Sequence, residues 1–358
     1  MIDSTKCIDC KKCEAVCPIQ QKFENEIGKY AYAAFSNCPD VRFRGSSGGL
    51  FETISKTVID RGGCVFASRF DEQLKLRGFE ATSIVEVQKL TKSKYLQSDS
   101  IYLFPIVKQR ILEGREVLFC GTPCQAAAIK RYLGKYSDRE NFFLLDFFCH
   151  GVPSQSLFDK CISLVEKDKG IHISSYEFRT KRNNGATPHY YTIVYEKNGK
   201  SIKKTQLYIK DPFYLGFQKY ITLRDSCYHC PYGKGNHVGD ITIGDFHDIG
   251  KYVQDVNRFD GVSTVIINTD KGQSVWSQVK EQLMAYEMDI HLLHEDGLIY
   301  SGGTQEPESR KEFVHDIETK SFDEVVSRWF NPKREWKKEL YYSLPKYLRD
   351  FIKSVVGI

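Results

Sequence analysis

The segment VLFCGTPCQ, residues 117–125, decides the fold of this chain. A run of four apolar residues meets a Gly-Thr-Pro turn and then opens a helical pattern that continues to residue 133. The same order repeats over residues 142–165, where an apolar run leads through CHGVPS into another helical pattern. Strands that are apolar throughout and alternate with helices are typical of a buried parallel sheet. We therefore predict an α/β fold.

Cysteines follow both apolar runs. Cys120 and Cys124 follow the first run, and Cys149 follows the second. Because ligands of such sheets bind at the carboxyl ends of the strands, we expect these three thiols to meet at one edge.

Bulk properties narrow the class of protein. The 358 residues suffice for two or three domains, and 41% hydrophobic with 27% charged residues is ordinary for a globular chain. A net charge of +5 is too small to indicate nucleic-acid binding. There is no apolar stretch of membrane-spanning length and no signal-peptide character at the N-terminus, which predicts a cytoplasmic location. Twelve cysteines there indicate metal or redox chemistry rather than disulfides.

The most specific motif is CIDCKKCEAVCP, residues 7–18, which has the spacing of a bacterial ferredoxin run. Its thiols are Cys7, Cys10, Cys13 and Cys17. In such runs the first three hold one 4Fe-4S cluster and the fourth serves the other cluster of a pair. One run is present here, so the fourth ligand stays open between Cys17 and Cys38. A zinc site is the alternative.

A second motif, RGSSGGL at residues 44–50, precedes a helical pattern that runs to residue 59. Hydroxyls and glycines at a helix N-terminus form a seat for phosphate, although a plain N-cap with a flexible turn fits equally well. Arg44 favours the phosphate. Downstream, Lys94 and Tyr95 are candidates for contacts to a cofactor phosphate or ring. The alternative is that the lysine is solvated and the tyrosine is packed in the core. Basic residues at 181–185 indicate either an acidic ligand or a solvated hairpin tip.

A second thiol pair, Cys227 and Cys230, is incomplete as a metal site, because a site with four ligands needs two more. Cys124 and Cys149 can supply the two missing ligands, and Cys120 is a further candidate. The main alternative is a disulfide between Cys227 and Cys230. Two further thiols, Cys64 and Cys161, lie inside apolar patterns and are predicted to be core residues.

After residue 301 the chain becomes charged and then alternates basic and aromatic residues over 322–329 and 336–356. Helices packed on the main body are the preferred reading. An amphipathic tail that docks a partner or touches a membrane surface is the alternative.

These motifs occur in a characteristic order: SSGG at 46–49, SKYLQS at 93–98, GTPCQ at 121–125, CHGVPS at 149–154, CYHCP at 227–231 and DITIGDF at 240–246. Together they resemble the beta subunit family of coenzyme F420 hydrogenases and dehydrogenases, from the ferredoxin run to about residue 275. The resemblance implies an iron–sulfur flavoprotein, in which one or two 4Fe-4S clusters feed FAD on an α/β core. Ferredoxin or a partner subunit would donate electrons, and deazaflavin coenzyme F420 or another small organic molecule would accept them.

Carried onto this chain, the resemblance implies four regions. They are a ferredoxin-type segment at 1–30, the two parts of the family core at 40–165 and 166–300, and a helical tail at 301–358. It implies FAD contacts at Ser46, Ser47, Gly48, Gly49, Gly121 and Thr122, with Lys94 a further candidate. His150 would relay a proton or bond a cluster sulfur, and Asp245 would lie on the substrate side.

One departure matters, because family members often carry two ferredoxin runs and this run aligns with the second. Many bacterial relatives occur in organisms expected to lack the deazaflavin, and some are linked to polysaccharide biosynthesis. Two functions therefore stay open. The first is a flavin-dependent oxidoreductase, and the second is a non-catalytic electron-transfer or adaptor subunit that docks through the tail. A zinc-bound protein without redox activity is a third reading.

Overall fold

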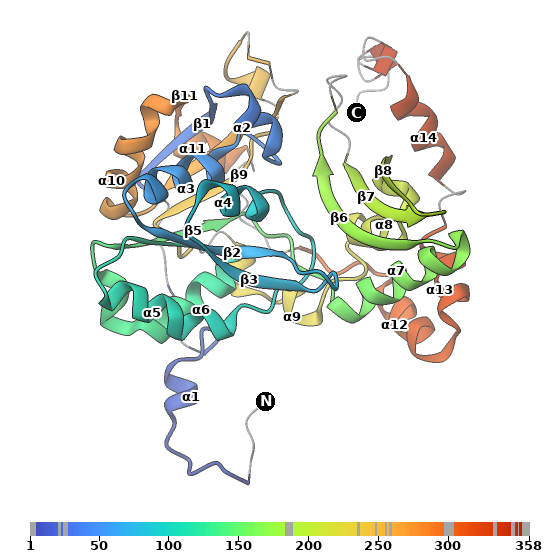
Figure 1. The fold of residues 1–358 in the computed structure, drawn as a ribbon, viewed down its shortest axis with the longest axis horizontal. Helices are drawn as coiled ribbons and strands as arrows, with labels where there is room; N and C mark the ends of the chain where they lie inside the picture. The colour runs from blue at the N-terminus through green and yellow to red at the C-terminus, as the bar shows by residue number, and fades with distance from the viewer. Residues whose placement is uncertain are drawn as a thin grey trace.

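Two sheets organise the chain into lobes that lie side by side (Figure 1). The larger lobe holds an eight-stranded sheet and the smaller lobe a three-stranded sheet. The structure is a computed structural model, and it describes residues 5–20, 23, 28–182, 189–234, 237–247, 249–254, 256–257, 260–296, 304–331, 335–344, 348–349 and 351–352. A segment with the short helix α1 (Lys12–Ala15) projects from the larger lobe.

The larger sheet is parallel in its middle and antiparallel toward both edges. In spatial order its strands are β11 (Leu283–Met288), β1 (Tyr30–Ser36), β10 (Ser263–Ile267), β9 (Ile241–Asp245), β5 (Phe142–Phe147), β4 (Val117–Cys120), β2 (Cys64–Phe70) and β3 (Leu76–Ala81). β2, β4, β5 and β9 run parallel. The α/β fold predicted from residues 117–165 is therefore confirmed.

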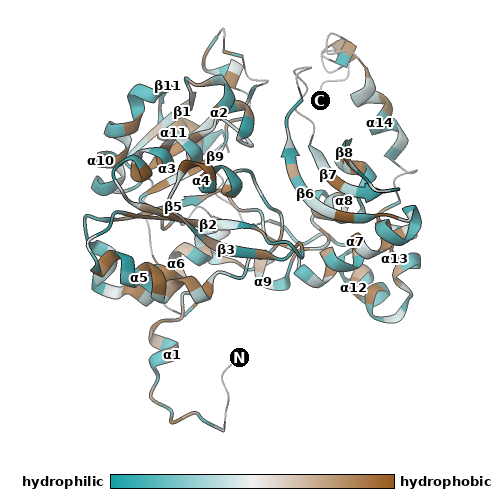
Figure 2. Ribbon diagram, in the orientation of Figure 1, coloured by the Kyte–Doolittle hydropathy of each residue, from teal (hydrophilic) through white to brown (hydrophobic). Residues whose placement is uncertain are grey.

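Helices cover both faces of the parallel strands. On one face α3 (Leu50–Asp60), α4 (Ile84–Leu90) and α10 (Asp270–Val279) pack against strand residues such as Leu118. On the other face α5 (Phe104–Leu112) and α6 (Pro123–Leu133) pack against its neighbour Phe119. Successive strand residues point to opposite faces, so a strand covered on both sides must be apolar throughout. Figure 2 shows the resulting apolar residues along β5 and on α5.

The smaller lobe has an aromatic core beneath an antiparallel sheet. Its elements are α7 (Gln155–Lys169), β6 (His172–Thr180), β7 (Tyr190–Lys197), β8 (Lys200–Leu207), α8 (Pro212–Gln218), α9 (Asp225–Tyr228), α12 (Arg310–Thr319), α13 (Phe322–Trp329) and α14 (Trp336–Ser343). Phe158 of α7 and Phe178 of β6 belong to this core, as do Phe313, Val325 and Phe330 of the C-terminal region. The helix α13 therefore packs on the body, as the preferred reading expected. The helix α12 does so too, although its charged sequence suggested a loop.

Short elements complete the description. They are the helices α2 (Pro39–Arg44) and α11 (Ile290–Glu295) and the 3-10 turns η1 (Ile101–Leu103), η2 (Gly134–Asp138), η3 (Tyr208–Lys210), η4 (Pro231–Lys234), η5 (Ile249–Lys251) and η7 (Lys280–Gln282). Among the described residues, no helix combines the length and the apolar character needed to cross a bilayer.

Candidate functional site

Four thiols from distant parts of the sequence meet at one pocket of about 110 Å³. They are Cys124, Cys149, Cys227 and Cys230. Cys124 lies in the first turn of α6 after β4, and Cys149 follows β5, so both stand at the carboxyl edge of the parallel strands. The segment after α8 brings the other two to the same place. The structure thus joins the four residues that sequence analysis grouped.

Local hydrogen bonds fix the sulfurs of this pocket. The Thr122 hydroxyl lies 3.2 Å from the Cys124 sulfur. The N–H of Gly151 donates to the Cys149 sulfur and the N–H of Val152 to the Cys227 sulfur, each at 3.4 Å. Backbone donors of this kind stabilise thiolates bound to iron and tune their potential.

Gly151 is needed in this arrangement. Its φ of +102° lies in the left-handed region, and a Cβ there would come within 2.9 Å of the Cys227 Cβ. A larger residue would therefore push the Cys149 loop away from Cys227.

Three thiols of the pocket favour the neutral state. Withdrawal from water raises the pKa of Cys124, Cys149 and Cys227, and the neighbouring thiols add to the rise in each case. Thiols of this kind lose their protons when a metal replaces them, because the metal's charge compensates the thiolates. The donor set therefore fits a metal centre.

Four cysteine ligands are typical of two kinds of metal centre, a single zinc and a 4Fe-4S cluster. Across the described residues, no three His, Cys, Asp or Glu side chains converge closely enough to hold a single ion. A single zinc draws every sulfur to about 2.3 Å from one point. A 4Fe-4S cluster binds each thiolate through a different iron, so its ligands stand farther apart around a cavity. The four thiols on the pocket wall are a donor set that either centre takes.

Cys120 does not belong to this set. It is absent from the pocket wall, and burial raises its pKa to about 12 against the opposing charge of Lys94. The structure does not support Cys120 as a further candidate ligand.

The N-terminal run lies on the projecting segment. Cys7, Cys10 and Cys13 are exposed and Cys17 is half-buried. Left-handed φ angles at Asp9 and Lys11, of 51° and 58°, curl the backbone between the cysteines.

The structure separates the two candidates for the fourth ligand. Cys38 precedes α2, and α2 and α1 lie at opposite ends of the larger lobe (Figure 1). Cys38 is therefore remote from the run, and Cys17 remains.

The small residues at 46–49 are packed against two strands. Gly48 donates its N–H to the Ser263 hydroxyl at 2.9 Å, and a Cβ on Gly48 would lie 2.4 Å from the Ala34 carbonyl oxygen. The Ser47 hydroxyl donates to the Val262 carbonyl at 2.6 Å, and Gly49 with φ +86° begins α3. Close packing alone thus requires small residues here, whether or not a phosphate binds.

Arg44 is paired, which corrects an expectation. Its guanidinium binds Glu52 in the first turn of α3 at 2.6 Å, and Glu52 is only 3% exposed. Because a carboxylate already complements this helix N-terminus, Arg44 does not favour a phosphate at this turn.

A partly buried ion pair joins the two lobes close to these loops. Arg179 of β6 binds Asp245 at the end of β9 at 2.7 Å, and also donates to the Tyr95 hydroxyl at 3.2 Å and the Ser46 carbonyl at 3.1 Å. Burial would raise the pKa of Asp245, but Arg179 outweighs it and holds the pKa at about 2. Sequence analysis missed Arg179, because an arginine in an alternating strand resembles a solvated one.

Two lysines donate to backbone carbonyls nearby. Lys181 donates to the carbonyls of Arg42, Ser47 and Asp260 at 2.5–2.6 Å. Of the basic turn that begins there, residues 183–185 lie outside the described residues. Lys94 donates to the last carbonyls of α4 at 2.6 Å, and burial lowers its pKa to about 7.

His150 lies between the thiol pocket and the ion pair. Its carbonyl accepts from the Thr304 hydroxyl at 2.6 Å. Burial lowers the pKa of its imidazole, while the charge of Asp245 acts in the opposite direction.

One segment, residues 93–98, links the ion pair to the thiol pocket. The Ser93 N–H donates to the Ser46 hydroxyl at 2.8 Å, and Tyr95 meets Arg179. Three residues later Ser98 lines the thiol pocket and accepts from the Gln125 amide at 2.8 Å. Six extended residues span at most about 20 Å, so the two places are neighbours.

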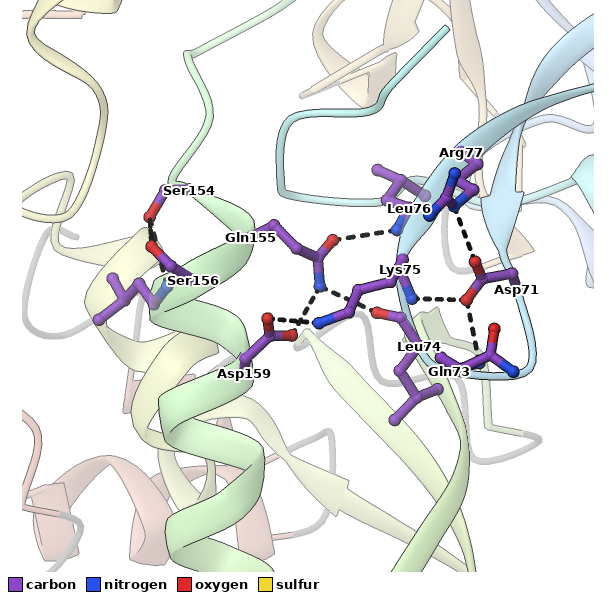
Figure 3. Close-up of polar contacts among 11 residues, drawn as sticks. Asp71, Gln73, Leu74, Lys75, Leu76, Arg77, Ser154, Gln155, Ser156 and Asp159 are labelled. Carbon is purple, nitrogen blue, oxygen red and sulfur yellow. Dashed lines mark hydrogen bonds and ion pairs between the residues drawn. The ribbon is translucent and has the colours of Figure 1, made fainter.

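The Cys149 loop is held by the helix that follows it (Figure 3). The Gln155 amide donates to the Leu74 carbonyl at 2.9 Å and accepts from the Leu76 N–H at 3.0 Å. Lys75 and Asp159 add an ion pair at 2.5 Å. The turn between β2 and β3 thus fixes the start of α7.

Fold and site together define an α/β protein with a thiol-lined pocket at the edge of its sheet, suited to metal or redox chemistry. Residues 114–291 match the family of the C-terminal region of the coenzyme F420 hydrogenase/dehydrogenase beta subunit. The chain belongs to the beta subunit family of F420 hydrogenases and dehydrogenases, as the resemblance predicted. Its class is that of an oxidoreductase subunit that takes part in electron transfer.

A solved structure has a similar fold. It is a chain of the F420-reducing NiFe hydrogenase complex from Methanosarcina barkeri, with a TM-score of 0.50 at 16% identity over 84% of this chain and 97% of that one. No curated protein matches this chain in sequence.

Proposed function

We propose that this chain is an iron–sulfur flavoprotein oxidoreductase. It takes electrons from ferredoxin or a partner subunit, passes them through two 4Fe-4S clusters to FAD, and delivers them to coenzyme F420 or another small organic acceptor. The observation that carries the proposal is that four thiols line one pocket near the ion pair of Arg179 and Asp245.

The thiols would hold the two clusters. Cys124, Cys149, Cys227 and Cys230 are assigned to the core cluster, and Cys7, Cys10, Cys13 and Cys17 to the entry cluster. Bound there, the clusters supply one-electron transfer, and FAD converts between one- and two-electron steps. The backbone donors of Gly151 and Val152 orient the core sulfurs.

The flavin is assigned to the space along residues 93–98. Ser46, Ser47, Gly48, Gly49, Lys94, Gly121 and Thr122 are its proposed contacts. Thr122 lines the thiol pocket, and the Ser46 hydroxyl accepts from the N–H of Ser93 near the ion pair of Arg179 and Asp245. The proposed contacts therefore extend from the thiol pocket to the ion pair. The set brings a flavin close to the core cluster.

Two further residues have proposed roles in the reaction. His150, next to Cys149, is assigned to relay a proton to the acceptor, with a hydrogen bond to a cluster sulfur as the alternative role. Asp245 acts through Arg179, whose guanidinium it holds at 2.7 Å, and is therefore a positioning residue on the acceptor side.

The test is the content of iron, acid-labile sulfide and flavin per chain after purification without oxygen. The expected result is about eight irons and one FAD. Cys227→Ser should leave about four irons, those of the entry cluster. Cys161→Ser is the matched control, since Cys161 is a buried core thiol away from the pocket and its loss should leave the iron unchanged.

Other outcomes would reject parts of the proposal. A colourless chain with stoichiometric zinc would establish a structural protein, and iron without flavin would establish an adaptor subunit. Unchanged iron in Cys227→Ser would remove the core cluster from the pocket.

A further inference from the structure

Tyr232 connects the N-terminal run to the core pocket. It lies in η4, two residues after Cys230, and lines the thiol pocket with only 1% of its surface exposed. Its hydroxyl donates a hydrogen bond to the carbonyl of Pro18, the residue after Cys17. The last cysteine of the run and the last cysteine of the core set are therefore each within two residues of this bond.

Phe23 provides a second attachment for the same segment. Its ring lies beneath the Arg131 guanidinium at 4.2 Å and the Lys130 ammonium at 5.1 Å, both on α6. Phe23 packs on the same apolar cluster as Tyr232 and Cys230. Cys124 lies in the first turn of α6, and Cys230 directly precedes η4, so each attachment is on an element that carries or adjoins a core thiol.

We propose that Tyr232 is a positioning residue that docks the entry cluster against the core cluster. The inference rests on the proposed function, because it requires clusters at both thiol sets. With clusters bound at both thiol sets, one electron would pass from the reduced entry cluster to the oxidised core cluster, with no proton or bond transferred. The route runs through Cys17 and Pro18, across the hydrogen bond to Tyr232, and through Pro231 to Cys230.

The bond to Pro18 is the one non-covalent step in this route. Residues 5–16 and 19–20 of the projecting segment are exposed, with Ile8 84% exposed and Ile19 53% exposed. Loss of the bond should therefore let the run move relative to the pocket without disturbing either set of thiols.

Tyr232→Phe tests this, because it removes the hydroxyl and keeps the ring in its apolar site. Iron and sulfide per chain should stay at the wild-type value. The magnetic coupling between the two reduced clusters, measured by electron paramagnetic resonance, should weaken. The rate at which the core cluster is reduced after rapid mixing with a reduced two-cluster ferredoxin should fall by about fivefold or more. Loss of one neutral hydrogen bond changes a population about fivefold, and the hydroxyl bonds the Phe23 backbone as well as Pro18.

Two further variants sharpen the experiment. Phe23→Leu weakens the second attachment and should reduce the coupling in the same way. Tyr132→Phe is the matched control, since it removes a hydroxyl from a tyrosine of α6 that is 42% exposed and does not line the pocket, and it should change nothing.

Unchanged coupling and rate in a fully loaded Tyr232→Phe chain would overturn the positioning role. Loss of core iron in that variant would also overturn it, since Tyr232 would then be needed to assemble the core site. A wild-type chain with iron only in the core site would instead reject the two-cluster function itself.

Discussion

At the scale of single residues, the ion pair between Arg179 and Asp245 is the most consequential feature. The two side chains are 19% and 27% exposed, and they belong to different sheets. A charge removed from water without its partner is costly, so each residue depends on the other. The pair therefore fixes the smaller lobe on the larger one beside the proposed flavin site.

We expect Asp245→Asn to lower the free energy of unfolding by about 2–3 kcal/mol at pH 7, because Arg179 is left without its partner. The folded pKa of Asp245, about 2, is below its ordinary value of 3.8. The pair's contribution is thus complete above about pH 4 and is lost as the pH falls toward 2. Urea unfolding at pH 7 and pH 3 measures both effects, and the difference between wild type and variant should shrink at pH 3.

Asp60→Asn is the control for this prediction. Asp60 pairs with Lys56 one turn earlier on α3, and with side chains 57% and 50% exposed such a pair contributes little. An equal loss in both variants would contradict the special role of the pair between the lobes.

At the scale of secondary structure, α7 and the turn between β2 and β3 act together. The Gln155 amide meets the backbone of Leu74 and Leu76 much as a neighbouring strand would (Figure 3). Because α7 begins directly after residues 149–154, this contact also limits the movement of the Cys149 loop.

Gln155→Ala should lower the free energy of unfolding by about 1–2 kcal/mol, since it leaves two backbone groups without their partner. Urea unfolding followed by circular dichroism measures the loss. Ser156→Ala, one residue along on the exposed side of α7, removes a contact to Ser154 of 3.0 Å and should have little effect. Equal stability of the two variants would show that the Gln155 contact does not hold the helix.

At the scale of the whole molecule, the C-terminal helices belong to the core of the smaller lobe. Phe330 follows α13, is completely buried, and contacts Gly216 of α8. Trp336 and Leu340 of α14 are more than half exposed, so α14 presents apolar side chains to solvent.

Phe330→Ala should lower the free energy of unfolding by about 3–4 kcal/mol, because it opens a cavity in an aromatic core. Trp336→Ala should leave stability near that of wild type, since its ring is 57% exposed. Urea unfolding of the two variants compares them directly. A larger loss for Trp336→Ala would mean that α14, rather than residues up to Phe330, stabilises the lobe.

The sequence by itself determined the parallel centre of the larger sheet and the grouping of the core thiols. Strands buried on both faces must be apolar throughout, so residues 117–120 and 142–147 were recognisable without knowledge of their neighbours. Sheet topology then places Cys124 and Cys149 at one edge of the sheet. A site with four ligands needs two more thiols, which the pair Cys227 and Cys230 can supply.

Only the tertiary structure decided which side chains contact one another around the thiol pocket and between the lobes. It paired Arg44 with Glu52, removed Cys38 and Cys120 from the candidate ligands, and joined Arg179 to Asp245 and Tyr232 to Pro18. The residues that form these contacts are not related by a helical or strand period, and some of them lie in different lobes. Local patterns record which face of an element is buried, and they carry no record of which distant side chain meets it there.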